Sequence, residues 1–118
     1  MTTKFACRLR KDGAYLIIAL AGYMNDQGGA TLNDVMRNAD FVDIKAVLFD
    51  FGECTLVNSQ GIACLLDHCD RLVEQQRMAV AFCRVPPLLK EAFSLVGLLD
   101  MVSAFGTEQE ARSALGHG

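Results

Sequence analysis

The chain has 118 residues, of which 52% are hydrophobic and 21% are charged, and its formal net charge at pH 7 is −3. This length suits a single domain with one core, and this composition excludes a disordered chain. The slightly acidic balance gives no sign of direct nucleic-acid binding, so we expect proteins or small molecules as partners.

No segment has the character of a membrane span or a leader peptide. The longest apolar run, Ala14 to Ala21, is much shorter than the roughly 20 residues that a transmembrane helix needs. The first ten residues carry no long apolar segment of the signal-peptide type. We therefore expect a cytoplasmic protein without a membrane span.

The cysteines favour buried, reduced thiols. They are odd in number and form no Cys-x-x-Cys pair. A zinc site would need four clustered ligands, and of the two histidines one, His117, belongs to a tail that we expect to be mobile. We expect no metal and no cofactor. The cysteines on apolar stretches are expected to be buried, whereas the one in a predicted loop should be exposed; these are Cys64, Cys69 and Cys83, and Cys54.

The first predicted elements form a hairpin. The runs Phe5 to Arg10 and Ala14 to Ala21 are separated by the short polar connection Lys11-Asp12-Gly13. An Asp-Gly pair between two such runs is typical of a tight turn between antiparallel strands. The sequence therefore predicts a β-hairpin at the start of the chain.

A helix should follow, with Asn25 or Asp26 as its cap. Its inward positions recur at helical spacing at Leu32, Val35, Met36 and Ala39. Gly28 and Gly29 fall in its first turn. Two interpretations of this pair are open: a frayed helix start, or bare backbone that lets another surface approach closely.

The centre of the chain is a strand, a loop and a long helix. Ala46 to Phe51 is apolar on both faces apart from Asp50, which is typical of a strand in the middle of a covered sheet. A loop is expected from Gly52 to Asn58, and then a helix from Ser59 to about Gln76 with Ser59 as its N-cap. Its inward stripe follows helical spacing, and its polar face should be solvated. These positions are Ile62, Leu65, Leu66, Cys69, Leu72 and Val73 inward, and Asp67, His68, Asp70, Arg71 and Glu74 outward.

The C-terminal part continues the alternation. We predict a strand over Met78 to Cys83, a helix from Pro86-Pro87 to Gly97, a strand over Leu98 to Ala104, and a terminal helix after Thr107. The last helix begins with Thr-x-x-Glu, the pattern of a capping box. The order β-β-α-β-α-β-α-β-α predicts an α/β domain over residues 1–118. It should hold a mixed, mostly parallel sheet of about five strands, covered by about four helices.

Ser59 is a poor candidate for a catalytic nucleophile. The string Val57-Asn58-Ser59-Gln60-Gly61 matches only half of the Gly-x-Ser-x-Gly elbow, because Val57 replaces the first glycine. Nor is there a base: His68 lies nine residues further along the same helix, about 13 Å away at 1.5 Å per residue. We therefore expect that the protein is not an enzyme.

Three stretches together resemble the STAS domain of bacterial anti-sigma factor antagonists, and the likeness covers essentially the whole chain. They are the junction Asn58-Ser59-Gln60-Gly61-Ile62, the strand Leu48-Phe49-Asp50-Phe51 and the Val96-Gly97-Leu98 end of the third helix. The family's usual junction is Asp-Ser-Ser/Thr/Ala-Gly-Leu. Gly22-Tyr23-Met24-Asn25 resembles its Gly-x-Leu/Ile-Asp near the partner-binding surface. The chain departs from both patterns, because Asn58 and Asn25 stand where the family usually has Asp.

This resemblance implies a partner-switching role. In the family, the serine that matches Ser59 is phosphorylated by an anti-sigma factor that is itself a serine kinase, and a serine phosphatase restores it. The unmodified form binds the anti-sigma factor, which frees the sigma factor. The resemblance therefore implies that Ser59 is the phosphorylation site, and that Asn25 and the residues from Asn58 to Ile62 bind the partner.

The chemistry of a helix N-terminus agrees with a switch at Ser59. A phosphate there lies against free amides and the positive end of the helix dipole, so the fold should survive. About two added negative charges would change the contact surface. The alternative is a STAS binding module that is never phosphorylated, part of a transport or signalling complex, in which the two asparagines reflect relaxed selection on the site.

Overall fold

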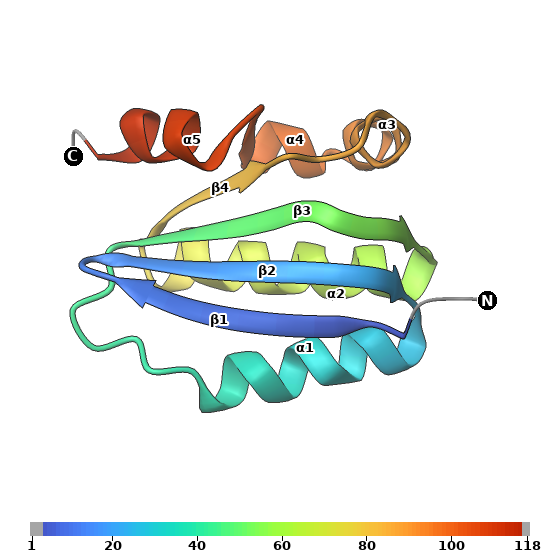
Figure 1. The fold of residues 1–118 in the computed structure, drawn as a ribbon, viewed down its shortest axis with the longest axis horizontal. Helices are drawn as coiled ribbons and strands as arrows, with labels where there is room; N and C mark the ends of the chain where they lie inside the picture. Colours follow the sequence, from blue (N-terminus) through green and yellow to red (C-terminus); the bar gives the residue numbers. More distant parts are fainter. Residues whose placement is uncertain (1–3, 117–118) are drawn as a thin grey trace.

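A five-stranded sheet runs through the centre of the part of the chain that the structure, a computed structural model, describes, residues 4–116 (Figure 1). The strand order is β1-β2-β3-β4-β5; β1 pairs antiparallel with β2, and the other neighbours pair in parallel. This confirms the predicted hairpin and the mixed, mostly parallel sheet. The strands are β1 (Ala6–Asp12), β2 (Tyr15–Met24), β3 (Ala46–Val57), β4 (Ala79–Cys83) and β5 (Ser103–Phe105).

Helices follow each strand from β2 onward, as the alternating pattern predicts. A π-helical turn, η1 (Arg71–Gln75), extends α2 toward the predicted end of that helix. The Thr107 side chain accepts a hydrogen bond from the Glu110 amide at 3.0 Å, which confirms the predicted cap of the last helix. The helices are α1 (Asp26–Asn38), α2 (Ser59–Asp70), α3 (Pro87–Leu95), α4 (Leu98–Met101) and α5 (Glu108–Leu115).

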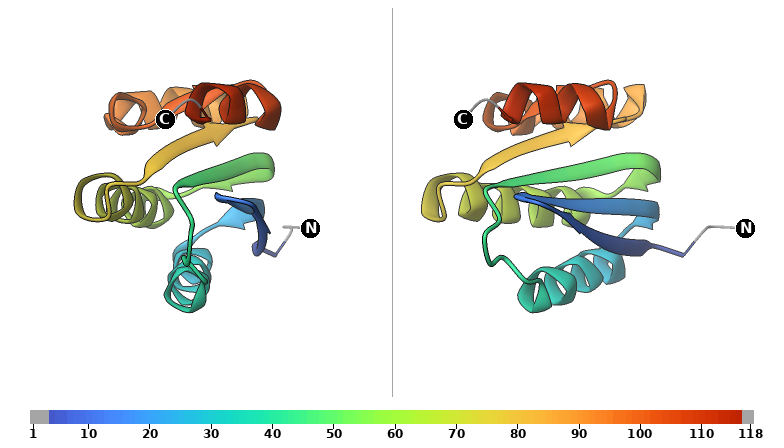
Figure 2. Two further views of the ribbon diagram at one scale, coloured as in Figure 1. Left: turned by 90° about the vertical axis from the view of Figure 1, so that its left-hand side faces the viewer. Right: turned by 60° about the vertical axis from the view of Figure 1, so that its left-hand side comes forward.

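The two faces of the sheet are covered unequally. Alternate residues of the central strands, such as Ile18, Phe49 and Phe82, point into the larger core under α1 to α4. The residues between them, such as Ile17 and Leu48, point to the opposite face, where α5 covers a smaller cluster (Figure 2). The chain therefore has one main core and a thin second layer.

Four phenylalanines join the sheet to α3. Phe82 lies edge-on to Phe49, Phe51 and Phe93, with ring centroids 5.7, 4.9 and 5.8 Å apart respectively. Offset edge contacts of this kind add to the stabilisation from burial alone. They hold α3 against the strand that leads to α2.

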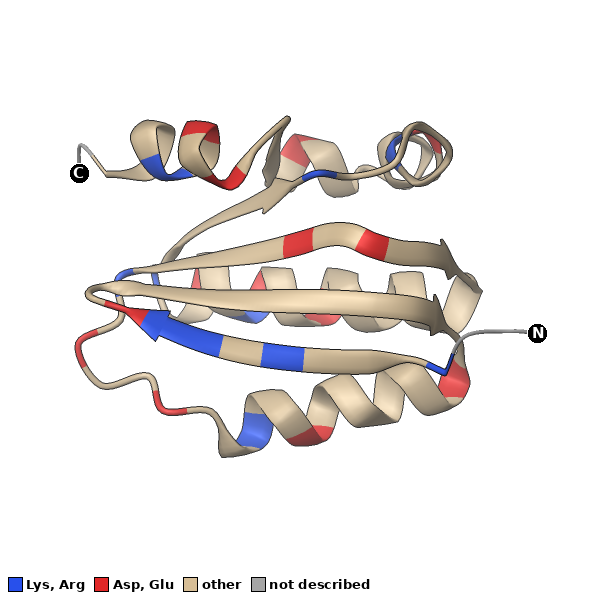
Figure 3. Ribbon diagram, viewed as in Figure 1, with Lys and Arg blue, Asp and Glu red and all other residues tan. Residues whose placement is uncertain are grey.

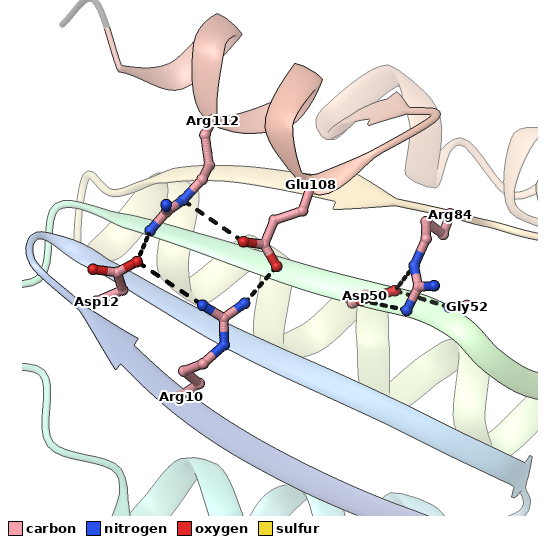
Figure 4. Close-up of polar contacts among 7 residues, drawn as sticks. All are labelled: Arg10, Asp12, Asp50, Gly52, Arg84, Glu108 and Arg112. Atoms are coloured by element: carbon pink, nitrogen blue, oxygen red, sulfur yellow. Dashed lines mark hydrogen bonds and ion pairs between the residues drawn. The ribbon is translucent and has the colours of Figure 1, made fainter.

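Charged side chains fasten α5 to the hairpin (Figure 4). Glu108 accepts a hydrogen bond from the Arg10 guanidinium at 2.5 Å, and Arg112 donates to Asp12 at 2.6 Å. The Arg112 guanidinium also lies over the Tyr15 ring, 4.6 Å from its centroid. Each exposed pair stabilises the fold by less than about 1 kcal/mol, so the apolar cluster beneath α5 must supply the rest.

Asp50 has a partner on the same face of the sheet (Figure 4). The residue is 8% exposed, and its carboxylate accepts hydrogen bonds from Arg84 at 3.0 and 2.9 Å and from the Gly52 amide at 2.9 Å. A paired carboxylate of this kind can be buried within an otherwise apolar strand. The interruption of the apolar run at Asp50 is therefore structural.

The predicted loop from Gly52 to Asn58 is wrong, because β3 continues to Val57. Beyond Asp50, β3 pairs with β2 alone, and the register shifts near Ala21 and Gly22. Cys54 is consequently buried, not exposed, and burial raises its pKa to about 11. The expectation that Cys54 is the accessible thiol is wrong.

The other cysteines follow the prediction in part. Cys69 and Cys83 are buried, and burial raises their pKa to about 12 and about 11. Cys64 is only partly buried, because it lies between α1 and α2. All five are free thiols, as expected for this spacing.

The predicted strand from Leu98 to Ala104 is wrong in its first half. Gly97 has φ +81°, in the left-handed region that favours glycine, and the chain then makes the short helix α4. Only Ser103–Phe105 joins the sheet, as β5. The sheet edge beyond β4 is therefore shorter than the sequence predicts.

Candidate functional site

The N-termini of α1 and α2 are capped in the same way. The Asn25 Oδ1 atom accepts a hydrogen bond from the Gly28 amide at 3.0 Å, and the Asn58 Oδ1 atom accepts from the Gly61 amide at 2.9 Å. Asn25 is one of the two caps that the sequence allowed for α1. Both asparagines thus provide the oxygen that a cap requires.

Ser59 is not the N-cap of α2, contrary to the prediction. Asn58 has extended backbone angles, φ −84° and ψ −179°, and Ser59 is already the first helical residue. Asn and Ser are comparable caps, so capping preference does not distinguish the two positions. The cap is Asn58, one residue earlier than predicted. The Ser59 side chain is therefore free of the capping role, and the residue is exposed.

Backbone contacts lock the start of α2 onto the end of β2. The Asn58 amide donates to the Met24 carbonyl at 3.0 Å. A Cβ atom added at Gly61 would lie 2.7 Å from both the Met24 carbonyl oxygen and a Val57 methyl group. Only glycine fits this approach, so the position of Ser59 relative to β2 is fixed by backbone atoms.

A side-chain bridge joins the two helix starts. The Asn58 Nδ2 atom donates to the Asp26 Oδ1 atom at 3.1 Å. The sequence offered Asp26 only as an alternative cap for α1, and the structure gives it a different task. The signal in the sequence was the repeated pattern of a capping asparagine before each helix, with an acid after one of them.

The residues predicted to bind a partner fall together at this end of the molecule, but they differ in exposure. Ser59 and Gln60 are exposed, and Asn25, Asn58 and Ile62 are partly buried. Gly61 is buried against Met24. The side chains of Ser59 and Gln60 are therefore accessible at the surface, whereas Gly61 sets how closely the helix approaches β2.

Two hollows follow the contact between α1 and α2. The first, of about 570 Å³, is lined by residues that include Asp26, Gln60, Gly29 and Cys64. The second, of about 330 Å³, continues past Asn33 toward η1. A Cβ atom at Gly29 would lie 3.7 Å from Cys64, and one at Gly28 would lie 3.1 Å from Phe5. The bare backbone at Gly28 and Gly29 thus allows close packing by Phe5 and Cys64 of the same chain. The start of α1 is capped by Asn25, so the interpretation as a frayed helix start is wrong.

The sequence predicted that His68 lies on the solvated face of α2, and this prediction is wrong. His68 is 6% exposed, and its Nε2 atom lies 2.6 Å from the Asn33 Oδ1 atom on α1. A carbonyl oxygen only accepts hydrogen bonds, so the neutral ring carries its proton on Nε2. The expected solvated face does hold for Asp67 and Arg71, which are exposed and form an ion pair at 3.0 Å.

Burial lowers the pKa of His68 below its ordinary value, because the charged ring loses solvation. The unfolded chain then binds the proton more readily than the folded one, so stability falls as pH drops from about 6.5 toward the lowered pKa. We expect the free energy of unfolding, measured in urea, to decline from pH 7.5 to 5. His68→Gln should flatten this decline. An equal slope in the wild type and in His68→Gln would contradict this role.

Between residues 4 and 116, no hydrogen bond joins Ser59 to His68. His68 faces Asn33 on the α1 side of α2, and His117 lies outside the described residues. Between residues 4 and 116, no group of three or more His, Cys, Asp or Glu side chains is placed to hold a metal ion. In the same range, every helix is too short or too polar to cross a membrane.

Comparison with known proteins places the chain in one family. A family model described as the STAS domain matches residues 8–111. No curated protein sequence matches the chain significantly. The family is therefore shown by the domain match and not by a close relative.

Solved structures of similar fold include anti-sigma factor antagonists. One from Mycobacterium paratuberculosis is 13% identical, with a TM-score of 0.83, and the match covers 96% of this chain and 95% of that one. The Bacillus cell fate determinant SpoIIAA in its phosphorylated form is 19% identical, with a TM-score of 0.70 and coverage of 92% and 98%. The murine solute carrier 26 family member A9 anion transporter also matches, at 12% identity and a TM-score of 0.73, over 92% of this chain and 19% of the transporter.

Proposed function

We propose that this chain, which belongs to the STAS domain family, is an anti-sigma factor antagonist that switches partners through phosphorylation of Ser59. Unmodified, it binds an anti-sigma factor that is also a serine kinase. Phosphorylation releases the partner, and a serine phosphatase restores the first state. The proposal places the protein in the cytoplasm, as one STAS domain over residues 1–118, acting by binding and not as an enzyme.

The observation that carries this proposal is the position of Ser59. Its hydroxyl belongs to the first residue of α2, it is exposed, and it is not used for capping. Asn58 satisfies the Gly61 amide, and the amides of Ser59 and Gln60 lie ahead of the first hydrogen bond of the helix. A phosphate on Ser59 would therefore meet free amides and the positive end of the helix dipole.

Phosphorylation at this place would change the surface without unfolding the helix. A phosphoserine brings close to two negative charges and three acceptor oxygens. The backbone contacts at Asn58 and Gly61 do not involve the Ser59 side chain, so they would remain. Repulsion and desolvation at the contact would then weaken partner binding, while the fold stays intact.

The proposed partner surface consists of residues that gather around the two helix starts. Exposed side chains at Ser59 and Gln60 would make direct contact, flanked by the partly buried Ile62. The two capping asparagines would contribute through their position at the rim. The proposed set is Asn25, Asn58, Ser59, Gln60, Gly61 and Ile62.

A second candidate function is a STAS binding module that is never phosphorylated, within a transport or signalling complex. Its support is the likeness to the murine anion transporter and the asparagines at the two capping positions. In this case Ser59 would be an ordinary surface residue, and the helix start a fixed docking surface.

Intact mass spectrometry separates the two candidates. We expect the protein, incubated with ATP and a serine kinase of the anti-sigma factor class from the same organism, to gain the mass of one phosphoryl group. Ser59→Ala should gain none, although its stability should change by less than about 0.5 kcal/mol because the cap is at Asn58. Thr55→Ala, which removes another exposed hydroxyl close in sequence, should be modified like the wild type. An unmodified wild type would support the binding module instead.

A further inference from the structure

Asn58 makes two hydrogen bonds that require different atoms. Its Oδ1 atom accepts from the Gly61 amide at 2.9 Å, and its Nδ2 atom donates to the Asp26 carboxylate at 3.1 Å. Capping alone needs only an oxygen, which Asp would supply as well. A carboxylate cannot donate, so the bridge to Asp26 requires an amide at this position.

The first turns of the two helices differ in charge. The first turn of α2 contains no acidic residue, whereas the first turn of α1 contains Asp26. Figure 3 shows this acidic band at the start of α1. Asp26 is exposed, and with Gln60 and Asp67 it lines the hollow between the two helices. A partner that contacts Gln60 therefore meets the Asp26 carboxylate.

The carboxylate is held in a fixed place relative to Ser59. Asn58 directly precedes Ser59 in the chain, and its backbone amide is bound to Met24 at 3.0 Å. Asp26 itself follows the cap of α1, which is held by the Gly28 amide. The bridge thus links the two capped helix starts. A charge held at a defined position can be recognised by a complementary charge on a partner.

We propose that Asp26 supplies the negative charge of the Ser59 surface, and that Asn58 is the positioning residue that holds it there. A basic side chain of the partner would bind this carboxylate. The statement about the partner rests on the proposed function; the statement about the pair does not. A phosphate on Ser59 would place a larger negative charge beside this carboxylate and compete with it for the partner's basic side chain, which displaces the contact that Asp26 makes.

The first test is a thermal double-mutant cycle that needs no partner. Asp26→Asn in the wild type should lower the melting temperature by about 1 to 3 °C, because a charge-assisted hydrogen bond becomes neutral. The same substitution in the Asn58→Asp background should raise it by about 2 to 4 °C, because it removes a like-charge contact and restores a donor. The sign of the effect should therefore reverse between the two backgrounds. Equal effects in both would overturn the pairing.

The second test measures whether the negative charge of Asp26 contributes to partner binding. With the anti-sigma factor kinase that phosphorylates the protein as the probe, Asp26→Asn should weaken binding roughly tenfold at low salt, and less at high salt. The double variant Asn58→Asp/Asp26→Asn swaps the two residues and returns one negative charge to the same bridge. It should restore most of the affinity. Asp34→Asn, a matched change two turns further along α1 at an exposed residue, should have little effect.

The outcomes separate the two claims. If Asp26→Asn binds no worse than Asp34→Asn, the role of Asp26 in recognition is overturned, whatever the melts show. If the wild type does not bind the kinase, the proposed function and the recognition role both fail, and the thermal cycle still decides the pairing. A sign reversal in the melts together with a restored affinity in the exchange supports both parts.

Discussion

Gly61→Ala should destabilise the protein by about 1 to 3 kcal/mol, the cost typical of forcing an extra methyl group into a closely packed site. The added Cβ atom would lie 2.7 Å from the Met24 carbonyl oxygen, a backbone atom that cannot swing aside, and 2.7 Å from a Val57 methyl group. The start of α2 must then move away from β2, which also weakens the cap at Asn58. Urea-induced unfolding measures the loss.

Gly29→Ala is the matched control for this change. Its added Cβ atom would make only ordinary contact with Cys64, at 3.7 Å. Because alanine stabilises a helix interior more than glycine does, the free energy of unfolding of Gly29→Ala should rise by up to about 1 kcal/mol. If the two variants unfold at the same urea concentration, the close approach at Gly61 does not constrain the site. A normal affinity of Gly61→Ala for the kinase would contradict its proposed part in placing Ser59.

Ser59→Asp should fold normally and yet weaken partner binding by about 1 to 3 kcal/mol, which is roughly 5-fold to 150-fold in affinity. An acidic residue in the first turn of a helix interacts favourably with the dipole, so the melting temperature should stay near that of the wild type. The mimic should act only in part, because phosphoserine brings close to two charges and a longer stem. Raising the salt concentration should recover some affinity if the contact is at the rim.

Ser59→Asn serves as the neutral control for the mimic, since its side chain has nearly the same shape as that of Asp. It should bind the kinase more tightly than Ser59→Asp at low salt, and the gap should narrow at high salt. Equal affinities for both variants would mean that bulk, and not charge, decides binding at Ser59. Unchanged affinity in both would place Ser59 outside the partner interface.

The hairpin, the alternation of strands and helices and the terminal cap could be predicted because each rests on local chemistry. The turn between β1 and β2, the inward stripe of α2 and the cap at Thr107 all depend on residues a few positions apart. Periodicity and capping preferences act over this range. The order of the elements then leaves few possible sheets.

The second half of β3 could not be predicted, because its environment depends on distant segments. From Ala46 to Asp50 the strand has partners on both sides, and its residues are uniformly buried. From Glu53 to Val57 it pairs with β2 alone, so exposed residues such as Thr55 are allowed and the apolar run ends. A strand at an open edge resembles a loop in sequence.

The N-cap of α2 was predicted to within one residue, and the error has a physical cause. Asn58 and Ser59 are both good caps, and helical periodicity does not distinguish starts that differ by one position. The bridge between Asn58 and Asp26, 32 positions apart in the chain, depends on how α1 and α2 lie against each other. The buried place of His68 has the same origin, because it depends on the approach of Asn33 from α1.

The central claim is that one modification, at Ser59, controls partner binding. Its most direct test is size-exclusion chromatography of the complex with the kinase, before and after addition of ATP, for the wild type and for Ser59→Ala. We predict that ATP dissociates the wild-type complex, that the released protein carries one phosphoryl group, and that the Ser59→Ala complex stays intact. Dissociation of the Ser59→Ala complex on addition of ATP, or a wild-type complex that persists although Ser59 is phosphorylated, would contradict the account.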